Sequence, residues 1–265
     1  MTDRTPPADP AELQVDRPAE GVVRLRVNRP AKRNALSIGV RNLMVDELRR
    51  LDADETVRAV IIAGGEKVFA SGADIEELAG ISPVKMMLRG ADRIWSAIAA
   101  FKKPLVAAVR GAAFGGGFEL AMNCDIVVAA SNAKFGLPEV RLGLIPGGGG
   151  TQRLIRLVGK HLAFDMLMTG RVIDGAEAMS HAIVSRCVDE EKVDDTAVAV
   201  ASAIASMAPL AVRLVKDAAL NGADSPLAAG IALERSSIQV LFDSEDYREG
   251  MAAFFEKRPP KFKGR

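Results

Sequence analysis

Apolar residues occur along this chain in short runs and in helical stripes, and the two patterns alternate. Residues 22–27 have the composition of a β-strand with partial alternation. The apolar runs at 58–63 and 104–109 are each closed by a following glycine, as suits buried strands. A further strand is expected at 125–129. Because strand, turn and helix recur at irregular intervals, the pattern favours an α/β fold or a spiral repeat over a solenoid of fixed repeat length.

Helical spacing of apolar residues begins after Ser37, a suitable N-cap for a helix that ends near Leu51. A second helix is expected at 82–101, and a short one begins at the three glycines 115–117. From Thr151 onward the pattern is helical. The later helices are predicted at 160–169, 175–181, 193–207, 210–221, 226–242 and 245–257.

These elements divide the chain into three regions. The polar, proline-rich segment 1–12 is expected to be a disordered tail, 13–190 an α/β core, and 191–265 a helical region. Helices of this kind often pack against neighbouring chains, so we expect the last region to mediate oligomerisation.

The composition is that of an ordinary globular protein, with 49% hydrophobic and 26% charged residues. A formal net charge of +1 gives no electrostatic basis for nucleic acid or a membrane as the main partner. An aromatic content of 5% also argues against a surface on which bases stack. Residues 1–12 do not resemble a signal peptide and no apolar stretch is long enough for a membrane span, so we expect a cytoplasmic protein.

The cysteines and histidines do not indicate a metal or disulfide site. Cys124 and Cys187 form no C-x-x-C motif, which favours two reduced thiols. His161 and His181 lack the spacing of metal ligands. No metal is therefore expected.

The glycines 115–117 are the first candidate for chemistry. Consecutive glycines let another group approach the backbone closely and let N–H groups point into a pocket. A tight connection from strand to helix is the alternative interpretation. A phosphate-binding Walker loop is excluded, because no G-x-x-x-x-G-K-[ST] motif occurs.

Two glutamates, Glu119 and Glu139, stand in apolar surroundings. Alone, Glu119 could be a carboxylate in the first turn of a helix and Glu139 a surface turn residue. A buried carboxylate has a raised pKa, which brings it into the range useful for proton transfer near neutral pH. As a pair on separate turns, the two could act on one water molecule from opposite sides.

Other polar or small residues have simpler interpretations. Asp74 is expected to cap a helix that starts near Ile75, and the backbone N–H of Ala73 is of more interest than the aspartate side chain. The glycines 147–150 indicate a flexible hinge or, as a second choice, the lining of a pocket. Trp95 is interpreted as a packing residue.

At these residues the chain resembles the crotonase (enoyl-CoA hydratase/isomerase) family, and most closely the enoyl-CoA hydratases. The resemblance covers nearly the whole chain, and the order and spacing of its motifs make it specific. The matching segments are NRPAKRNAL (28–36), FASGADI (69–75), KPLVAAVRGAAFGGGFELAMNCDIVVA (103–129), FGLPEVRLGLIPGGGGTQRL (135–154) and FFEKR (254–258).

The resemblance implies a crotonase-like spiral of β-β-α repeats with a helical C-terminal trimerisation region. It implies a homotrimer, or a hexamer built as a dimer of trimers. It also implies that the substrate is an acyl-CoA thioester, whose carbonyl oxygen is held in an oxyanion hole by the backbone N–H groups of Ala73 and Gly116. Coenzyme A is then part of the substrate, and no separate cofactor is expected.

The resemblance also assigns roles to the glutamates. Hydratases of the family have two, which match Glu119 and Glu139, whereas isomerases commonly keep a single working carboxylate. Water would add across the double bond of a 2-enoyl-CoA, with Glu119 orienting and deprotonating the water and Glu139 donating a proton to C2. The two carboxylates can also share both tasks.

The coenzyme A contacts are carried over from the same motifs. Ala31 and Arg33, together with Ser71, Asp74 and Ile75, match the region that holds the adenine and phosphates. Phe254 and Lys257 match a tail that can reach the ligand of a neighbouring subunit; a frayed basic C-terminus is the alternative.

Several alternatives stay open from the sequence. The protein could be an enoyl-CoA isomerase, or a hydratase of a branched, aromatic or dicarboxylic acyl group. A more distant alternative is a relative that binds RNA without catalysis, against which the near-neutral charge and both glutamates argue. The acyl chain, the pathway and the direction of the reaction are not encoded in any motif.

Overall fold

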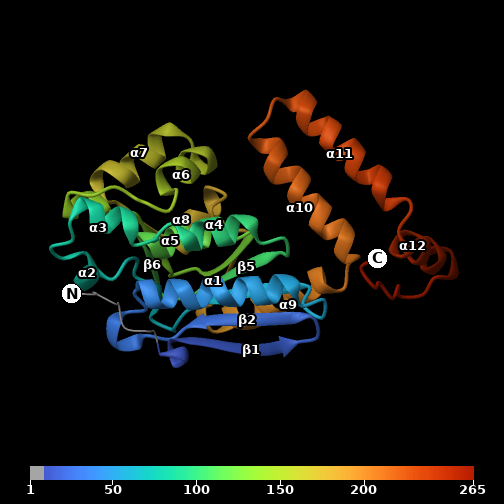
Figure 1. Cartoon of the computed structure of the whole chain (residues 1–265), viewed down its shortest axis with the longest axis horizontal. Coiled ribbons are helices and arrows are strands. Elements are labelled where there is room, and N and C mark those ends of the chain that lie inside the picture. The colour runs from blue at the N-terminus through green and yellow to red at the C-terminus, as the bar shows by residue number, and fades with distance from the viewer. Residues whose placement is uncertain (1–8) are drawn as a thin grey trace.

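The computed structural model describes residues 9–265 of the chain (Figure 1). Residues 1–8 of the predicted disordered tail lie outside the described residues. Residues 9–12 belong to a turn instead, because the side chain of Asp9 caps the short 3-10 helix η1 (Pro10–Glu12).

The larger sheet has six strands in the order β1-β2-β3-β5-β7-β10. Its first two strands form an antiparallel hairpin, and every later pair is parallel. All residues of β3 and β5 are buried, which explains their unbroken apolar sequences. The six strands are β1 (Leu13–Ala19), β2 (Val22–Val27), β3 (Ala59–Ala63), β5 (Leu105–Val109), β7 (Ile126–Ala130) and β10 (Arg186–Val188).

A second, four-stranded sheet has the order β4-β6-β8-β9. Each strand of the larger sheet in the middle of the chain is followed at once by a strand of the smaller one, so β3–β4, β5–β6 and β7–β8 are successive turns of a spiral. The predicted spiral α/β fold is therefore confirmed. The four short strands are β4 (Val68–Ala70), β6 (Ala112–Phe114), β8 (Lys134–Gly136) and β9 (Val172–Asp174).

The first long helix is α1 (Ile38–Ala53), and the hydroxyl of Ser37 caps it as predicted by accepting from the N–H of Val40. The single helix predicted at 82–101 is wrong. The chain forms α2 (Ile75–Leu78), α3 (Pro83–Leu88) and α4 (Arg93–Ala100), with a break at Gly90. Gly90 has a φ of +66°, which is incompatible with the interior of a right-handed helix.

The second of these turns places α5 (Gly116–Asn123) against β4. A Cβ on Gly117 would lie 2.0 Å from the carbonyl oxygen of Ala70, so only glycine permits this approach. The remaining helices of the core are η2 (Pro30–Lys32), η3 (Pro138–Leu142), α6 (Gly150–Val158), α7 (Lys160–Thr169), α8 (Gly175–Ser180), η4 (Glu190–Lys192) and α9 (Val193–Ala205).

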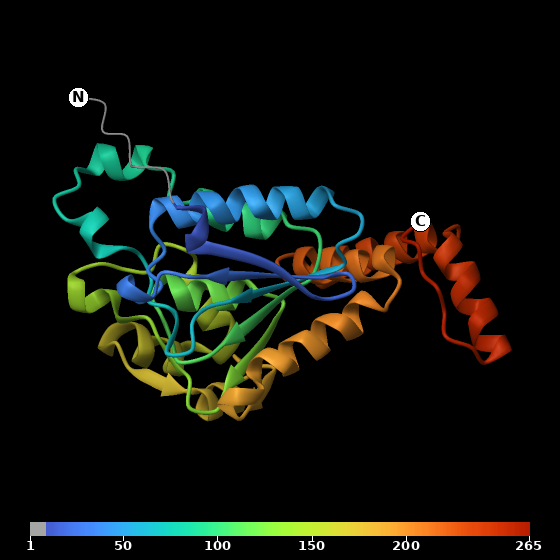
Figure 2. The same ribbon diagram turned by 90° about the horizontal axis from the view of Figure 1, so that it is seen from below.

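The helical C-terminal region begins later than the predicted residue 191. Helix α9 packs against β2, β3, β5 and β7, so it belongs to the core. The helices α10 (Pro209–Ala223), α11 (Leu227–Leu241) and α12 (Glu245–Glu256) then extend away from the core (Figures 1 and 2).

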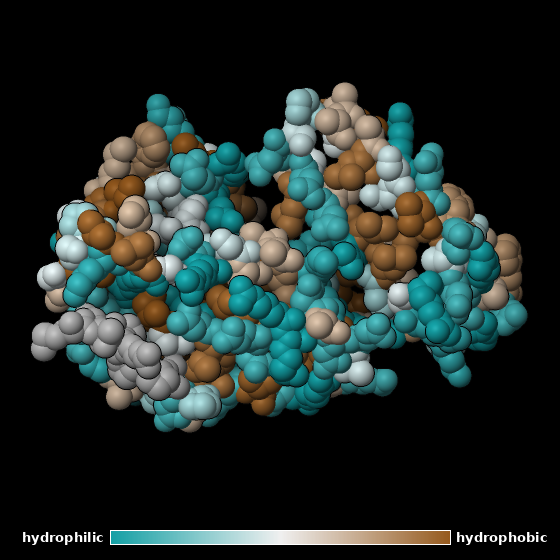
Figure 3. Space-filling model, viewed as in Figure 1, coloured by the Kyte–Doolittle hydropathy of each residue, from teal (hydrophilic) through white to brown (hydrophobic). Residues whose placement is uncertain are grey.

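These three helices leave much apolar surface uncovered. No residue of α10 or α11 is buried, although both helices are rich in aliphatic side chains. Figure 3 shows hydrophobic residues gathered over this part of the molecule. The exposed apolar side chains include those of Leu227, Val240, Phe242, Phe254 and Phe255.

Among residues 9–265, no single helix is both long and apolar enough to cross a membrane. The segments Glu190–Ala205 and Pro209–Ala223 together have a suitable length and composition, but they meet at a bend of 105°.

Candidate active site

A cavity of about 670 Å³ opens between the loop before α2, helices α3 and α4, the start of α5, and η3. Both predicted catalytic glutamates, Glu119 and Glu139, line it. The backbone of Ala73 and Gly116 lines it as well. The cavity therefore brings together residues from three separate segments of the chain, at Ala73, at Gly116 and Glu119, and at Glu139.

Two backbone N–H groups meet in this cavity. A Cβ on Gly116 would stand 3.8 Å from the amide nitrogen of Ala73, and a Cβ on Gly72 only 3.2 Å from the nitrogen of Gly116. Within residues 9–265, neither N–H has a hydrogen-bond acceptor. The arrangement needs glycine at Gly72 and Gly115, whose φ angles are +97° and +50°. Two donors without acceptors can bind one oxygen atom of a ligand.

Glu119 lies in the first turn of α5 and is buried. Its Oε1 accepts hydrogen bonds from the N–H groups of Gly148 (2.6 Å) and Gly150 (2.8 Å). Burial raises the pKa of Glu119, while these two N–H groups and the charges of Arg41 and Arg153 act in the opposite direction.

The glycines 147–150 therefore have a different role from the flexible hinge that was the first interpretation of the sequence. Gly147 and Gly148 line the cavity, and the loop holds the carboxylate of Glu119 in place. The second interpretation, the lining of a pocket, describes this loop.

Glu139 follows Pro138 in η3 and has fewer partners. Its Oε2 is buried and has no hydrogen-bond partner within the described part of the chain. Its Oε1 faces Gly115, where an added Cβ would lie 2.9 Å away. Burial raises the pKa of Glu139 to about 7, and the nearby charge of Glu119 adds to this shift. The two glutamates thus have different environments: Glu119 is held as an acceptor, and Glu139 is suited to carry a proton.

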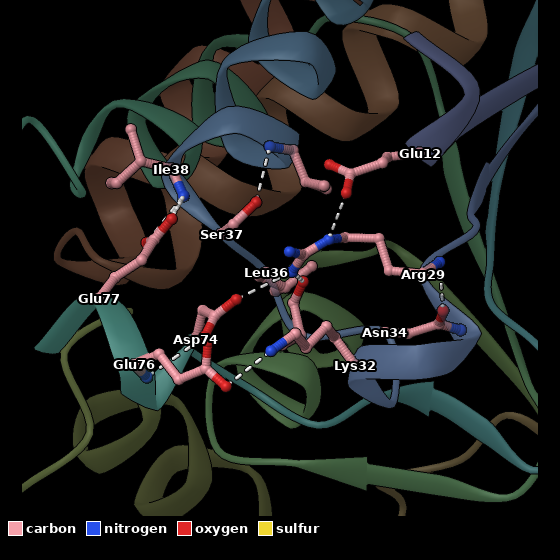
Figure 4. Close-up of polar contacts among 12 residues, drawn as sticks. Glu12, Arg29, Lys32, Asn34, Leu36, Ser37, Ile38, Asp74, Glu76 and Glu77 are labelled. Atoms are coloured by element: carbon pink, nitrogen blue, oxygen red, sulfur yellow. Dashed lines mark hydrogen bonds and ion pairs between the residues drawn. The ribbon is translucent and has the colours of Figure 1, made fainter. Parts of the chain in front are cut away.

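Asp74 acts as the predicted helix cap. Its side chain accepts from the N–H of Glu76 at the start of α2 and pairs with Arg29 at 3.1 Å (Figure 4). Arg29 also contacts Glu12 at 2.8 Å and donates to the carbonyl of Ala35. The Asp74 carboxylate is thus engaged within the protein and does not line the cavity.

Only some of the residues predicted to contact coenzyme A line the cavity. Ser71 and Ile75 line the cavity. Ala31 and Arg33 are exposed at η2, outside the cavity lining, where the neighbouring Lys32 pairs with Glu76 (Figure 4). The remaining two residues, Phe254 and Lys257, lie at α12, on the opposite side of the molecule from α2 and α3 (Figure 1).

Two residues that line the cavity were not recognised as site residues from the sequence. Trp95, interpreted as packing, contacts the Gly148 backbone closely and faces the cavity. Arg41 lines the cavity from α1 and stands near the Trp95 ring, 5.9 Å from its centroid. The sequence could have indicated that Arg41 is buried, because it lies at helical spacing from the apolar residues Met44, Val45 and Leu48 of α1.

Within residues 9–265, no three or more His, Cys, Asp or Glu side chains are grouped so that they could hold a metal ion.

A family model described as enoyl-CoA hydratase/isomerase matches residues 17–265. The chain belongs to this family. The resemblance seen in the motifs is thereby confirmed.

The chain is 44% identical over 238 residues to the probable enoyl-CoA hydratase echA8 of Mycobacterium leprae, covering 90% of this chain and 93% of the relative. It is 42% identical to the 2,3-dehydroadipyl-CoA hydratase of Escherichia coli, over 96% of this chain and all of that relative. A crystal structure of enoyl-CoA hydratase from Bacillus anthracis superimposes with a TM-score of 0.93 at 36% identity, covering 96% of this chain and 100% of that one.

The raised pKa of Glu139 predicts that this family member gains stability when the charge is removed. The folded pKa of about 7 exceeds the ordinary value of 4.5, so the folded state loses stability as pH rises between these values. We expect Glu139→Gln to raise the free energy of unfolding by about 1 to 3 kcal/mol at pH 8, allowing for partial solvent screening, and by much less at pH 5.

Urea unfolding at both pH values measures this difference. Glu47→Gln, which changes a half-buried glutamate of α1 that is paired with Arg50 outside the cavity, is the matched control and should show no such gain at pH 8. An equal gain for Glu139→Gln at pH 5 and pH 8 would contradict a raised pKa.

Proposed function

We propose that this protein is an enoyl-CoA hydratase, which adds water reversibly across the 2,3 double bond of a 2-enoyl-CoA thioester to give a 3-hydroxyacyl-CoA. The observation that carries the proposal is the pair of glutamates, Glu119 and Glu139, in one cavity with two backbone N–H groups that have no acceptor within residues 9–265. Addition of water to a conjugated thioester needs these parts: donors for the enolate oxygen, a base for water and an acid for C2.

The thioester carbonyl oxygen accepts hydrogen bonds from the N–H groups of Ala73 and Gly116, which form the oxyanion hole. As water attacks C3, negative charge moves to this oxygen and strengthens both bonds. The N-terminus of α5 begins at Gly116, so its partial positive charge lies at the same place. Loss of one such donor typically lowers the rate about 100- to 1000-fold.

Glu119 orients the water and removes its proton. Its Oε1 is occupied by Gly148 and Gly150, whereas its Oε2 accepts no hydrogen bond within residues 9–265 and is available to water. Glu139, whose pKa of about 7 keeps a large protonated fraction at neutral pH, donates the proton to C2. The proton taken up by Glu119 must then return to Glu139 before the next turnover, and solvent entering the cavity can carry it.

The enzyme needs no cofactor besides the coenzyme A of its substrate, because the two carboxylates and the two N–H groups can carry out each step. We place it in the cytoplasm and in thioester chemistry of the type found in fatty-acid β-oxidation. An isomerase would leave one of the two cavity glutamates without a task. The relatives do not agree on one acyl group, because one name specifies a 2,3-dehydroadipyl thioester and others only enoyl-CoA.

Comparing wild type with Glu119→Gln and Glu139→Gln tests the assignment. We expect wild type to consume crotonyl-CoA, seen as loss of the conjugated enoyl absorbance. Each variant should lower kcat/KM at least about 100-fold, because the amide can neither accept nor supply the transferred proton.

The variant Glu47→Gln, which lies outside the cavity, is the control and should keep the wild-type rate. Wild-type rates in both active-site variants would show that the chemistry lies elsewhere. Failure of the wild type on every enoyl-CoA offered would refute hydratase activity itself.

The pKa of Glu139 predicts the pH dependence of each direction. Hydration needs Glu139 protonated, so kcat/KM should fall as pH rises above about 7. Dehydration of the 3-hydroxyacyl-CoA needs the same single proton on the pair, carried by Glu119 instead, and the overall reaction releases no proton. Its kcat/KM should therefore fall through the same pH range, with a constant ratio between the two directions. Initial rates between pH 5 and 9 check this, and a hydration rate that rises through pH 7 would contradict the proton-donor role.

We propose that the protein is a homotrimer or a dimer of trimers formed through α10–α12. Three features support this: the uncovered apolar side chains of these helices, the position of α12 away from the cavity, and the placement of Phe254 and Lys257 on it. In an oligomer these two residues can contact the coenzyme A of a neighbouring subunit. Light scattering measures the mass, and a monomer at micromolar concentration would contradict the proposal.

A further inference from the structure

Arg41 projects from α1 into the cavity and is buried, with 9% of its surface exposed. Its Nε donates to the carbonyl of Leu36 at 3.0 Å, and its Nη1 to the carbonyl of Ala91 at 3.2 Å. Its Nη2 has no acceptor within residues 9–265. The guanidinium is therefore fixed by two bonds and keeps one nitrogen free to donate to a ligand.

Arg41 also forms no direct ion pair within residues 9–265. No carboxylate of the described residues lies within 4 Å of it, whereas Arg89, which lines the same cavity, is paired with Glu77. Burial and the charge of Arg89 lower the pKa of Arg41 from its ordinary value, while the more distant charges of Glu119 and Glu77 act in the opposite direction. An arginine nevertheless stays protonated at neutral pH. Buried charges in proteins are normally paired, so the missing anion is expected to come from a ligand.

The guanidinium lies close to the proposed oxyanion hole. Its Nη2 and the amide nitrogen of Ala73 are 3.7 Å and 3.8 Å from the point where a Cβ on Gly116 would stand. An acyl chain whose carbonyl oxygen is bound by these N–H groups therefore starts near the guanidinium. Only a short acyl chain is needed to bring its far end to Arg41.

The cavity is polar at its inner wall and apolar at its rim. Arg41, Trp95 and Glu119 meet at the inner wall. Side chains of Met87 and Ile145 at the rim are largely exposed. An alkyl chain end placed against Arg41 would displace water from its Nη2 and offer this buried nitrogen no acceptor in return.

We propose that Arg41 determines substrate specificity by binding a carboxylate at the far end of a short acyl chain. The preferred substrate is then the coenzyme A thioester of a short dicarboxylic enoic acid. This inference rests on the proposed function for its reaction but concerns the acyl group alone. The bond from Nη2 to a carboxylate oxygen is charge-assisted and forms in a buried site, where such bonds are strong.

A second role for Arg41 has to be distinguished from this one. Its charge favours the ionised form of Glu119, and its nitrogen could also donate to the enolate oxygen. Either effect would act on every enoyl-CoA equally. Recognition of a carboxylate acts only on substrates that carry one, so the ratio between charged and uncharged substrates separates the roles.

Binding of saturated thioesters tests the inference without catalysis. Calorimetry would compare succinyl-CoA with butyryl-CoA and glutaryl-CoA with pentanoyl-CoA, pairs that differ only in a terminal carboxylate in place of a methyl group. We expect wild type to bind the charged member of at least one pair about 30-fold or more tightly, and Arg41→Met to lose this preference. Arg89→Met is the matched control and should keep the preference, because the charge of Arg89 is already paired.

The comparison of charged with uncharged thioesters on the wild-type protein tests the inference by itself, even if Arg41→Met does not fold. Arg41→Lys gives a second variant that keeps the charge and should retain part of the preference. Equal or tighter wild-type binding of both uncharged thioesters would overturn the inference, and so would an equal loss for charged and uncharged thioesters in Arg41→Met. Hydration of crotonyl-CoA without any preference for carboxylates would refute this inference alone, whereas a preference without any hydration would refute only the proposed reaction.

Discussion

The site depends on the close contact between α5 and the strand β4. The backbone of Gly117 meets the carbonyl of Ala70 so closely that a single methyl group would prevent it. This contact brings the first N–H groups of α5 beside Ala73, and it places Glu119 one turn further along the same helix. Moving α5 outward by the width of a side chain would separate the two N–H groups and displace the carboxylate at the same time.

Backbone geometry also explains how two identical side chains acquire different properties. Glu119 accepts from two N–H groups at the start of α6, those of Gly148 and Gly150, which stabilise its charge. The buried Oε2 of Glu139 accepts from none within residues 9–265. An acid and an acceptor therefore arise from the same residue type through burial and hydrogen bonding. The oxygen of Glu139 without a partner is a local defect in stability, of the kind that active sites commonly retain.

The sequence predicted those helices and strands that are long enough to show a hydrophobic period or an apolar run. The apolar runs of β3, β5 and β7 and the stripe of α1 were predicted within a few residues, but strands of three residues such as β4 and β6 are too short to show a period. The motifs gave Glu119, Glu139, Ala73 and Gly116 as candidates, all of which line the cavity. They could not show that Gly148 and Gly150 hold Glu119, because donors and acceptor are distant in sequence and the interaction uses backbone atoms.

In a single chain, the cavity and the C-terminal helices are far apart. Its inner wall consists of residues of the spiral core, whereas the C-terminal helices that carry Phe254 and Lys257 extend away from it with apolar side chains uncovered. The cavity and the uncovered apolar surface thus lie on opposite sides of the chain, and the proposed oligomer would bring the two together. In the proposed oligomer, the acyl group is recognised within one subunit, where Arg41 lies, and the coenzyme A moiety between subunits.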